Sequence, residues 1–158
     1  MRSMKRILSL LLCLVLCLSL LPGAARAAET PIKVACVGDS ITYGHNPASN
    51  TGEPHFTTDN WTTLLGNQLG SGYEVKNYGR SGTTVMKNGD MPYWNQYVYT
   101  QSKNYQPNIV ILMLGTNDAK PANWAKKDQF LTDLKALIAE YQNLESKPEV
   151  YLDRKSVV

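Results

Sequence analysis

Apolar and polar residues alternate along the chain with two periodicities, which predict strands and helices in turn. Short apolar runs at 31–37 and 108–114 have the length of a buried strand, and a similar run begins at 148–152. Residues 73–78 alternate between apolar and polar side chains, which indicates a further strand. The run at 108–114 is almost wholly apolar, so we expect it at the centre of a parallel sheet.

Two segments between these strands carry apolar residues at helical spacing. The first begins near Asn60 and ends before Gly70, and the second covers 130–141. Residues 43–59 are polar and rich in Gly, Pro and Asn, which predicts a loop, whereas 80–106 is irregular and partly helical. The apolar positions of the two helices are Trp61, Leu64, Leu65 and Leu69, and Phe130, Leu131, Leu134, Leu137, Ile138 and Tyr141. Strands that alternate with helices predict the α/β class with a parallel sheet in one domain.

The N-terminal 27 residues have the layout of a secretory signal. A basic start is followed by the apolar run 7–21 and by the small-x-small cleavage pattern 25–27. An uncleaved anchor is the alternative, but the run is shorter than the ~20 residues of a membrane span, and Pro22 and Gly23 follow it directly. We therefore expect residues 1–27 to be removed from a secreted, periplasmic or cell-surface protein of bacterial type, without a stable membrane anchor.

Removal of the signal changes the charge and the cysteine content. The whole chain has 16 Lys and Arg against 13 Asp and Glu, and loss of the four basic residues of the signal leaves 12 against 13. Nothing in this balance suggests a nucleic-acid partner. Cys36 is the one cysteine after the signal and lies in an apolar strand, so we expect a core residue. The sequence contains no metal-binding cluster or cofactor fingerprint, and we expect neither.

Three predicted strands each end in a motif that contains glycine. The motifs are 38–42 (GDSIT), 77–82 (NYGRSG) and 115–118 (GTND). Because parallel strands bring their carboxyl ends to one edge of the sheet, one crevice would collect a serine hydroxyl, a glycine amide and an asparagine amide. This combination of groups is suited to acyl transfer.

The chemistry of ester hydrolysis gives each of these groups a role. The reaction passes through a tetrahedral oxyanion, and one preorganised N–H donor to that oxygen is worth ~3 to 4 kcal/mol. Ser40 lies at a strand-to-helix turn that exposes its hydroxyl, Gly79 has no side chain to obstruct its amide, and Asn117 brings a neutral donor. Taken alone, Asn117 and Asp118 would be read as a helix cap. Their position beside the other two motifs favours the catalytic reading.

These motifs resemble the SGNH/GDSL hydrolase family, whose blocks carry Ser in GDS, then Gly, then Asn in Gly-x-Asn-Asp, and last His in Asp-x-x-His. The resemblance implies that Ser40 is the nucleophile. It also implies that the Ser40 amide, the Gly79 amide and the Asn117 side chain form the oxyanion hole, with Asp39 and Asp118 as supports. The fold implied is a three-layer α/β/α sandwich with a flavodoxin-like parallel sheet.

The fourth block of the family has no match in these 158 residues. The general-base His and its Asp are therefore expected outside this sequence, as are the last strand and the C-terminal helix, so 28–152 would be a partial domain that is inactive alone. His45 and His55 are the only histidines, and we interpret both as surface-loop residues. Residues 153–158 match a translated sequencing adapter, so we expect a non-native tail and a natural protein that continues.

The resemblance also suggests the substrate. It is closest to sialate and carbohydrate O-acetylesterases, so we expect a serine ester hydrolase that removes acetyl or other short acyl groups from a small-molecule or glycan ester. The alternatives are a lysophospholipase or thioesterase, and a non-catalytic glycan-binding relative. Trp94 is the candidate substrate-binding aromatic residue, whereas most other aromatic residues between Tyr78 and Tyr105 are expected to pack in the core.

Overall fold

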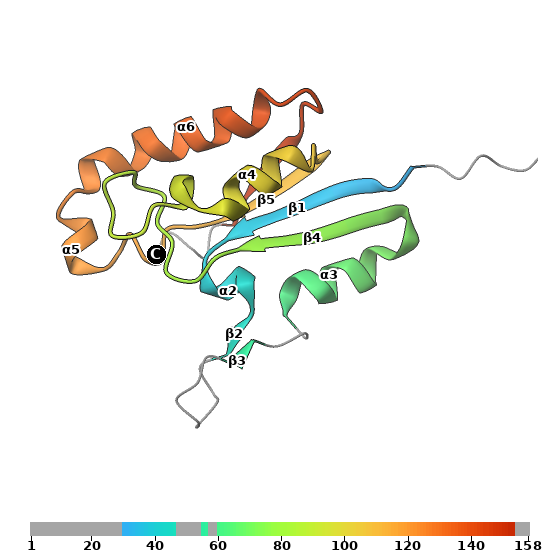
Figure 1. Cartoon of the computed structure of the whole chain (residues 1–158), viewed down its shortest axis with the longest axis horizontal. Coiled ribbons are helices and arrows are strands. Elements are labelled where there is room, and N and C mark those ends of the chain that lie inside the picture. The colour runs from blue at the N-terminus through green and yellow to red at the C-terminus, as the bar shows by residue number, and fades with distance from the viewer. Residues whose placement is uncertain (1–29, 47–54, 57–59, 154–158) are drawn as a thin grey trace, which may run out of the picture. The chain divides into compact units, whose positions relative to one another are not determined.

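Four parallel strands form the central sheet of the computed structural model, which describes residues 30–46, 55–56 and 60–153 (Figure 1). The strands lie in the order β4-β1-β5-β6. Their bounds are Ile32–Gly38 for β1, Tyr73–Gly79 for β4, Ile109–Met113 for β5 and Glu149–Leu152 for β6. All four strands predicted from the sequence are confirmed. The predicted signal, and the tail after Asp153, lie outside the described residues.

The register of the sheet brings the three glycine-containing motifs to one edge. Gly38 at the end of β1 pairs with Gly79 at the end of β4 on one side and with Met113 at the end of β5 on the other. From β1 the chain first adds a strand on one side and later adds two on the other. In doubly wound sheets, ligands bind at the carboxyl ends of the strands, where the strand order reverses. Here that point is the edge between β1 and β5.

Helices cover both faces of the sheet, which gives the predicted three-layer arrangement (Figure 1). The helix α3 lies on one side, against β4, while α4 and α6 lie on the other. Asn60 caps the start of α3, because its side-chain oxygen accepts hydrogen bonds from the backbone N–H groups of Thr62 and Thr63. The bounds are Trp61–Leu69 for α3, Tyr97–Asn104 for α4 and Phe130–Gln142 for α6.

The main hydrophobic core lies between the sheet and the layer formed by α4 and α6. Several aromatic side chains are buried in it, and their hydroxyl groups are paired: Tyr93 donates to the Tyr78 carbonyl oxygen at 2.7 Å, and Tyr141 shares a hydrogen bond with Ser102. The expectation that most of these aromatic residues pack in the core is confirmed. The core residues are Ala35, Val37, Val85, Met86, Tyr93, Val98, Tyr99, Val110, Leu112, Leu114, Phe130, Leu137 and Tyr141.

Cys36 is fully buried in β1, as expected for a core residue. Burial raises the pKa of its thiol to about 12, so the thiol stays protonated at neutral pH. A protonated, enclosed thiol is a weak nucleophile, which leaves Cys36 without a part in the chemistry.

Several short elements differ from the sequence prediction. The segment predicted as a loop contains a two-stranded antiparallel ladder of β2 and β3. The helical part predicted within residues 80–106 is confirmed as α4. Leu64 and Leu131, two of the apolar positions at helical spacing, are more than half exposed. The short elements are α2 (Ser40–Tyr43), β2 (His45–Asn46), β3 (His55–Phe56), α5 (Pro121–Trp124) and 3-10 turns at Gly70–Gly72, Tyr93–Asn95 and Lys127–Gln129.

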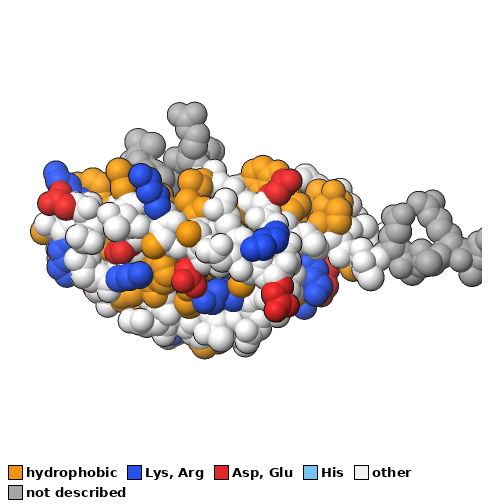
Figure 2. Space-filling model, turned by 90° about the horizontal axis from the view of Figure 1, so that it is seen from above, with side chains coloured by type: hydrophobic (Ala, Val, Ile, Leu, Met, Phe, Trp, Pro, Cys, Tyr) orange, Lys and Arg blue, Asp and Glu red, His pale blue; other side chains and the backbone are white. Residues whose placement is uncertain are grey.

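The surface over α4 and α6 carries charges of both signs. Figure 2 shows Lys and Arg side chains interspersed with Asp and Glu on this face. Neither sign of charge forms a continuous field there. None of the helices in the described residues is long and apolar enough to cross a membrane.

Candidate active site

The turn from β1 into α2 places Ser40 at the carboxyl edge of the sheet. Gly38 ends β1, where an added Cβ would collide with the side chain of Thr42, so only glycine allows the chain to turn this tightly. Ser40 then begins α2 and is partly exposed. Asp39 caps this helical turn, because its Oδ1 accepts a hydrogen bond from the Ile41 N–H at 3.0 Å. The predicted nucleophile is thus held on a fixed and accessible turn.

Asp39 connects this turn to the motif after β5. Its side chain is almost fully buried, and its Oδ2 lies 3.4 Å from the Asn117 Nδ2. Burial raises the pKa of the Asp39 carboxyl, and the hydrogen bond from the Ile41 N–H opposes that shift. This geometry fits the supporting role predicted for Asp39, since one carboxyl group contacts both the turn after β1 and the loop after β5.

Gly79 packs directly against the backbone of α2. An added Cβ would lie 2.7 Å from the Thr42 carbonyl carbon and would also collide with the Tyr43 N. The Gly79 N–H donates to the Asn77 Oδ1 at 2.8 Å, and the Asn77 Nδ2 donates in turn to the Thr42 carbonyl oxygen at 2.6 Å. The amide predicted for the oxyanion hole is therefore already engaged in this structure.

Replacement of Gly79 with alanine is expected to lower the free energy of unfolding by about 1 to 3 kcal/mol, because the methyl group meets backbone atoms that cannot move aside. Gly72→Ala is the matched control, since a Cβ at that glycine meets nothing within 4 Å. Urea denaturation of both variants measures the difference. Equal stability of the two variants would contradict the packing described.

Gly82 lies in the turn that follows Gly79 and has a φ of 84°, a conformation that favours glycine. The turn is closed by Thr83, whose N–H and hydroxyl both donate to the Arg80 carbonyl oxygen. Within the described residues, no hydrogen bond engages the Gly82 N–H. This amide is a free donor next to Thr83, which itself contacts Asn117.

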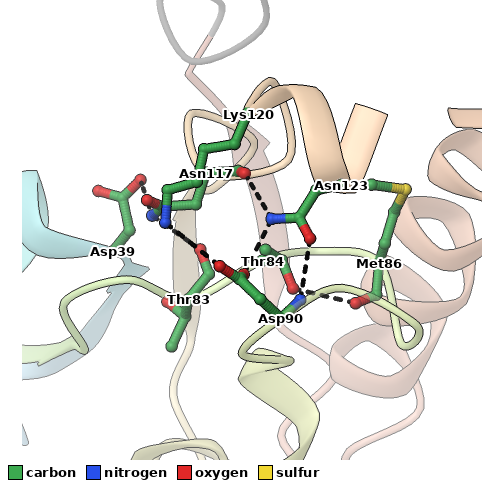
Figure 3. A network of polar contacts seen from close by, with 8 residues as sticks. All are labelled: Asp39, Thr83, Thr84, Met86, Asp90, Asn117, Lys120 and Asn123. Atoms are coloured by element: carbon green, nitrogen blue, oxygen red, sulfur yellow. Dashed lines mark hydrogen bonds and ion pairs between the residues drawn. The ribbon is translucent and has the colours of Figure 1, made fainter. Parts of the chain in front are cut away.

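Asn117 projects from the loop after β5 and is fixed by hydrogen bonds at two points. Its Nδ2 donates to the Thr83 carbonyl oxygen at 3.0 Å, and its own carbonyl oxygen accepts from the Asn123 Nδ2 at 2.9 Å (Figure 3). Its amide group is thereby placed between the loop after β4 and Asp39. The structure brings the predicted Asn117 and Asp39 together at one edge of the sheet.

Asp118 is fully buried beside this loop and points away from the surface. Its two carboxylate oxygens accept hydrogen bonds from the backbone N–H groups of Val85 at 2.9 Å and Met86 at 2.8 Å. Burial raises the pKa of Asp118, these two hydrogen bonds oppose the shift, and the charge of Asp39 adds to it. Asp118 therefore joins the loops after β4 and β5, which fits its predicted role as a support.

Trp94 is partly buried and packs against the hydrophobic core. Its Nε1 donates to the Val85 carbonyl oxygen at 2.8 Å, and its ring lies 5.6 Å from that of Tyr99. The Lys87 Nζ lies over the same ring, 4.0 Å from its centre. The predicted role of Trp94 in substrate binding stays a prediction.

The histidines and the metal-binding types of side chain were also considered in the sequence prediction. His45 and His55 lie on β2 and β3, and the positions of their side chains are not among the described features. Within the described part of the chain, no three His, Cys, Asp or Glu side chains gather as metal ligands. Sequence reasoning missed Asn123 and Asp90, whose contacts with the site come from tertiary structure and follow no local motif.

Comparison with known proteins identifies the family. Residues 36–156 match the model of the GDSL-like lipase/acylhydrolase family. The chain belongs to this family. An acetylxylan esterase from Xylanibacter ruminicola is 38% identical over 112 residues, which cover 70% of this chain and 22% of that protein. The chain thus spans about a fifth of the length of this curated relative.

Solved structures of esterases share the fold of this GDSL-like chain. The carbohydrate acetylesterase Est24 from Sinorhizobium meliloti superposes with a TM-score of 0.61 at 24% identity, over 77% of this chain and 62% of that one. A family two carbohydrate esterase from Clostridium thermocellum, solved with cellohexaose, gives a TM-score of 0.59 at 25% identity, over 80% of this chain and 44% of that one. These likenesses agree with the α/β/α architecture described above.

Proposed function

We propose that this chain carries the nucleophile and oxyanion hole of a serine ester hydrolase that removes acetyl or other short acyl groups from carbohydrates. The observation that carries the proposal is the carboxyl edge of β1, β4 and β5, where Ser40 is accessible and Asn117 is hydrogen-bonded into place beside Asp39. The 38% identity to an acetylxylan esterase supports an acetyl ester of a glycan as the substrate. Export through residues 1–27 would bring the enzyme to such glycans.

In the proposed reaction the Ser40 Oγ attacks the ester carbonyl carbon and the alcohol leaves, which forms an acyl-enzyme that water then hydrolyses. A general base must accept the serine proton. No Asp-x-x-His motif occurs in the 158 residues, so we assign the base to a part of the protein outside this sequence. The 158 residues alone are then expected to turn over esters poorly.

The oxyanion requires preorganised N–H donors. The Ser40 amide and the Asn117 side-chain amide are two of them in this proposal. The Thr83 carbonyl oxygen holds one hydrogen of the Asn117 Nδ2 at 3.0 Å, and the other hydrogen, whose contact with the Asp39 Oδ2 is longer at 3.4 Å, would turn to the oxyanion. For the third donor we propose Gly82 rather than the predicted Gly79, because the Gly79 N–H is bonded to Asn77, whereas no hydrogen bond engages the Gly82 N–H among the described residues. Gly82 also directly precedes Thr83, whose carbonyl oxygen holds the Asn117 amide.

The acyl preference can be measured with the 158-residue chain and with the full-length protein that the complete gene locus encodes, which we call the locus product. We expect the locus product to release acetate from acetylated xylan and p-nitrophenyl acetate, with p-nitrophenyl octanoate turned over at least about 10-fold more slowly. A preference for the octanoate ester or for lysophospholipid would assign a lipolytic enzyme instead. Binding of xylo-oligosaccharide without any turnover would indicate a glycan-binding relative.

A further inference from the structure

We infer that Asn123 is a positioning residue that holds the oxyanion-hole amide of Asn117 in place, and that Asp90 anchors Asn123. This inference rests on the proposed function, since it concerns how that site is organised. Asn123 lies in the short helix α5 and is 2% exposed. Its amide group lies between Asn117 and Asp90 (Figure 3).

All the hydrogen-bonding groups of the Asn123 amide are in use. Its Nδ2 donates one hydrogen to the Asn117 carbonyl oxygen at 2.9 Å and the other to the Asp90 Oδ1 at 2.8 Å. Its Oδ1 accepts from the Asp90 backbone N–H at 2.9 Å. An asparagine side chain offers two donors and one acceptor oxygen, so this arrangement matches that residue. An aspartate of the same shape has no donor to offer the Asn117 carbonyl.

The contact with Asn117 matters because Asn117 is held from two directions. Asn123 donates to its backbone carbonyl oxygen at 2.9 Å, which is closer than the Lys120 N–H at 3.3 Å, while the Thr83 carbonyl oxygen fixes its side chain. Thr83 and Asp90 both belong to the loop after β4, so this loop sets the position of the Asn117 amide through two routes. Loss of one route would let the amide shift, and a misplacement of about 1 Å can cost on the order of 100-fold in rate.

Asp90 is the solvent-exposed residue of the hydrogen-bond network that links it through Asn123 to Asn117. The hydrogen bond from Asn123 lowers the pKa of its carboxyl, and the nearby charge of Lys120 adds to this effect. The Lys120 Nζ lies 3.5 Å from the Asp90 Oδ2, and both side chains are about half exposed. Asp90 therefore stays ionised at neutral pH and keeps accepting from Asn123. Lys120 contributes little, because exposed ion pairs are weak.

Two variants separate the anchor from the contact with Asn117. Asn123→Asp removes both donors and places a carboxylate against Asp90, so we expect a loss of stability and a fall in kcat. The double variant Asp90→Asn/Asn123→Asp reverses donor and acceptor across the pair, which restores the anchor. It removes the Asn123 donor from the Asn117 carbonyl oxygen, which keeps only the longer hydrogen bond from the Lys120 N–H at 3.3 Å. Asp90→Asn alone keeps an acceptor for Asn123 and serves as the control for lost charge.

The experiment measures Tm and the hydrolysis of p-nitrophenyl acetate with the locus product. We expect the double variant to recover part of the Tm that Asn123→Asp loses, because the contact with residue 90 returns, while kcat stays about 10- to 100-fold lower with KM little changed. A double variant that recovers wild-type kcat, or that does not fold, would overturn the inference. If Asn123→Asp alone fails to fold, the double variant still decides the question.

A second measurement does not depend on catalysis. The side-chain amide resonances of Asn117 in the 158-residue chain are expected to shift in the double variant and to stay unchanged in Asp90→Asn. Unchanged Asn117 resonances in the double variant would overturn the inference. Shifted resonances in a locus product that shows no Ser40-dependent turnover would instead support the positioning role and count against the proposed function.

Discussion

Replacement of Ser40 with alanine is expected to lower kcat for p-nitrophenyl acetate by about 10⁴- to 10⁶-fold in the locus product, because no acyl-enzyme can form without the hydroxyl. The residual rate would come from substrate binding and the oxyanion donors alone. The fold should not change. Within the described residues the Ser40 side chain makes no hydrogen bond, and the helical turn is capped by Asp39.

Circular dichroism should therefore give Ser40→Ala the Tm of wild type, and mass spectrometry should detect an acetyl adduct in wild type only. Ser146→Ala is the matched control, because its buried hydroxyl also lacks a hydrogen-bond partner in the described structure but lies outside the three motifs. This control should retain full turnover. Turnover by Ser40→Ala at a wild-type rate would show that the nucleophile is a different group.

Replacement of Asp118 with alanine is expected to lower the free energy of unfolding by about 2 to 6 kcal/mol. The carboxylate satisfies two backbone N–H groups, those of Val85 and Met86, and each buried donor left unpaired costs about 1 to 3 kcal/mol. A loss of this size is a large part of the stability of a small domain. Urea denaturation followed by tryptophan fluorescence measures it.

Asp128→Ala is the control for Asp118→Ala, because Asp128 is exposed, and its effect should stay within about 0.5 kcal/mol. The free energy of unfolding can also be compared between wild type and Asp118→Asn as a function of pH, because the asparagine side chain does not titrate. Burial raises the folded-state pKa of Asp118, so its contribution to stability is full below the unfolded value of about 3.9 and is lost as the pH rises through the folded value. The advantage of wild type over Asp118→Asn should therefore grow as the pH falls. Equal losses for Asp118→Ala and Asp128→Ala would refute the role described for Asp118.

The sheet could be predicted because buried strands carry their signal locally. The run 108–114 is almost wholly apolar because helices cover both faces of the parallel sheet (Figure 1). The glycine that follows the run marks the end of the strand, where catalytic residues were expected. The motif residues Ser40 and Asn117 followed from the same logic, because parallel strands must end at a common edge. The helix positions were less certain. Leu64 and Leu131 have helical spacing, yet each is more than half exposed, since spacing alone does not show where the covered face ends.

The remaining features of the site depend on contacts between distant residues. Asn123 gains its role from Asp90, 33 residues away, and nothing in its own neighbourhood indicates this. Gly79 was a reasonable oxyanion donor by sequence, but Asn77 occupies its amide. Trp94 is an aromatic residue near the site in sequence, but Tyr99 and Lys87 pack against its ring. In each case a third group determines what surrounds a donor or a ring.

The strand order has a consequence for synthesis on the ribosome. The strand that leads to Ser40 is made first, but it lies between β4 and β5, and the Asp39 contact with Asn117 spans 78 residues. Non-local contacts of this kind form slowly, because loop closure must precede them. At about 5 to 20 residues per second, the nascent chain carries its serine for several seconds before residue 123 emerges. Ser40 is therefore translated before the rest of the site, but it reaches its folded surroundings only after the loop that carries Asn117 has been made.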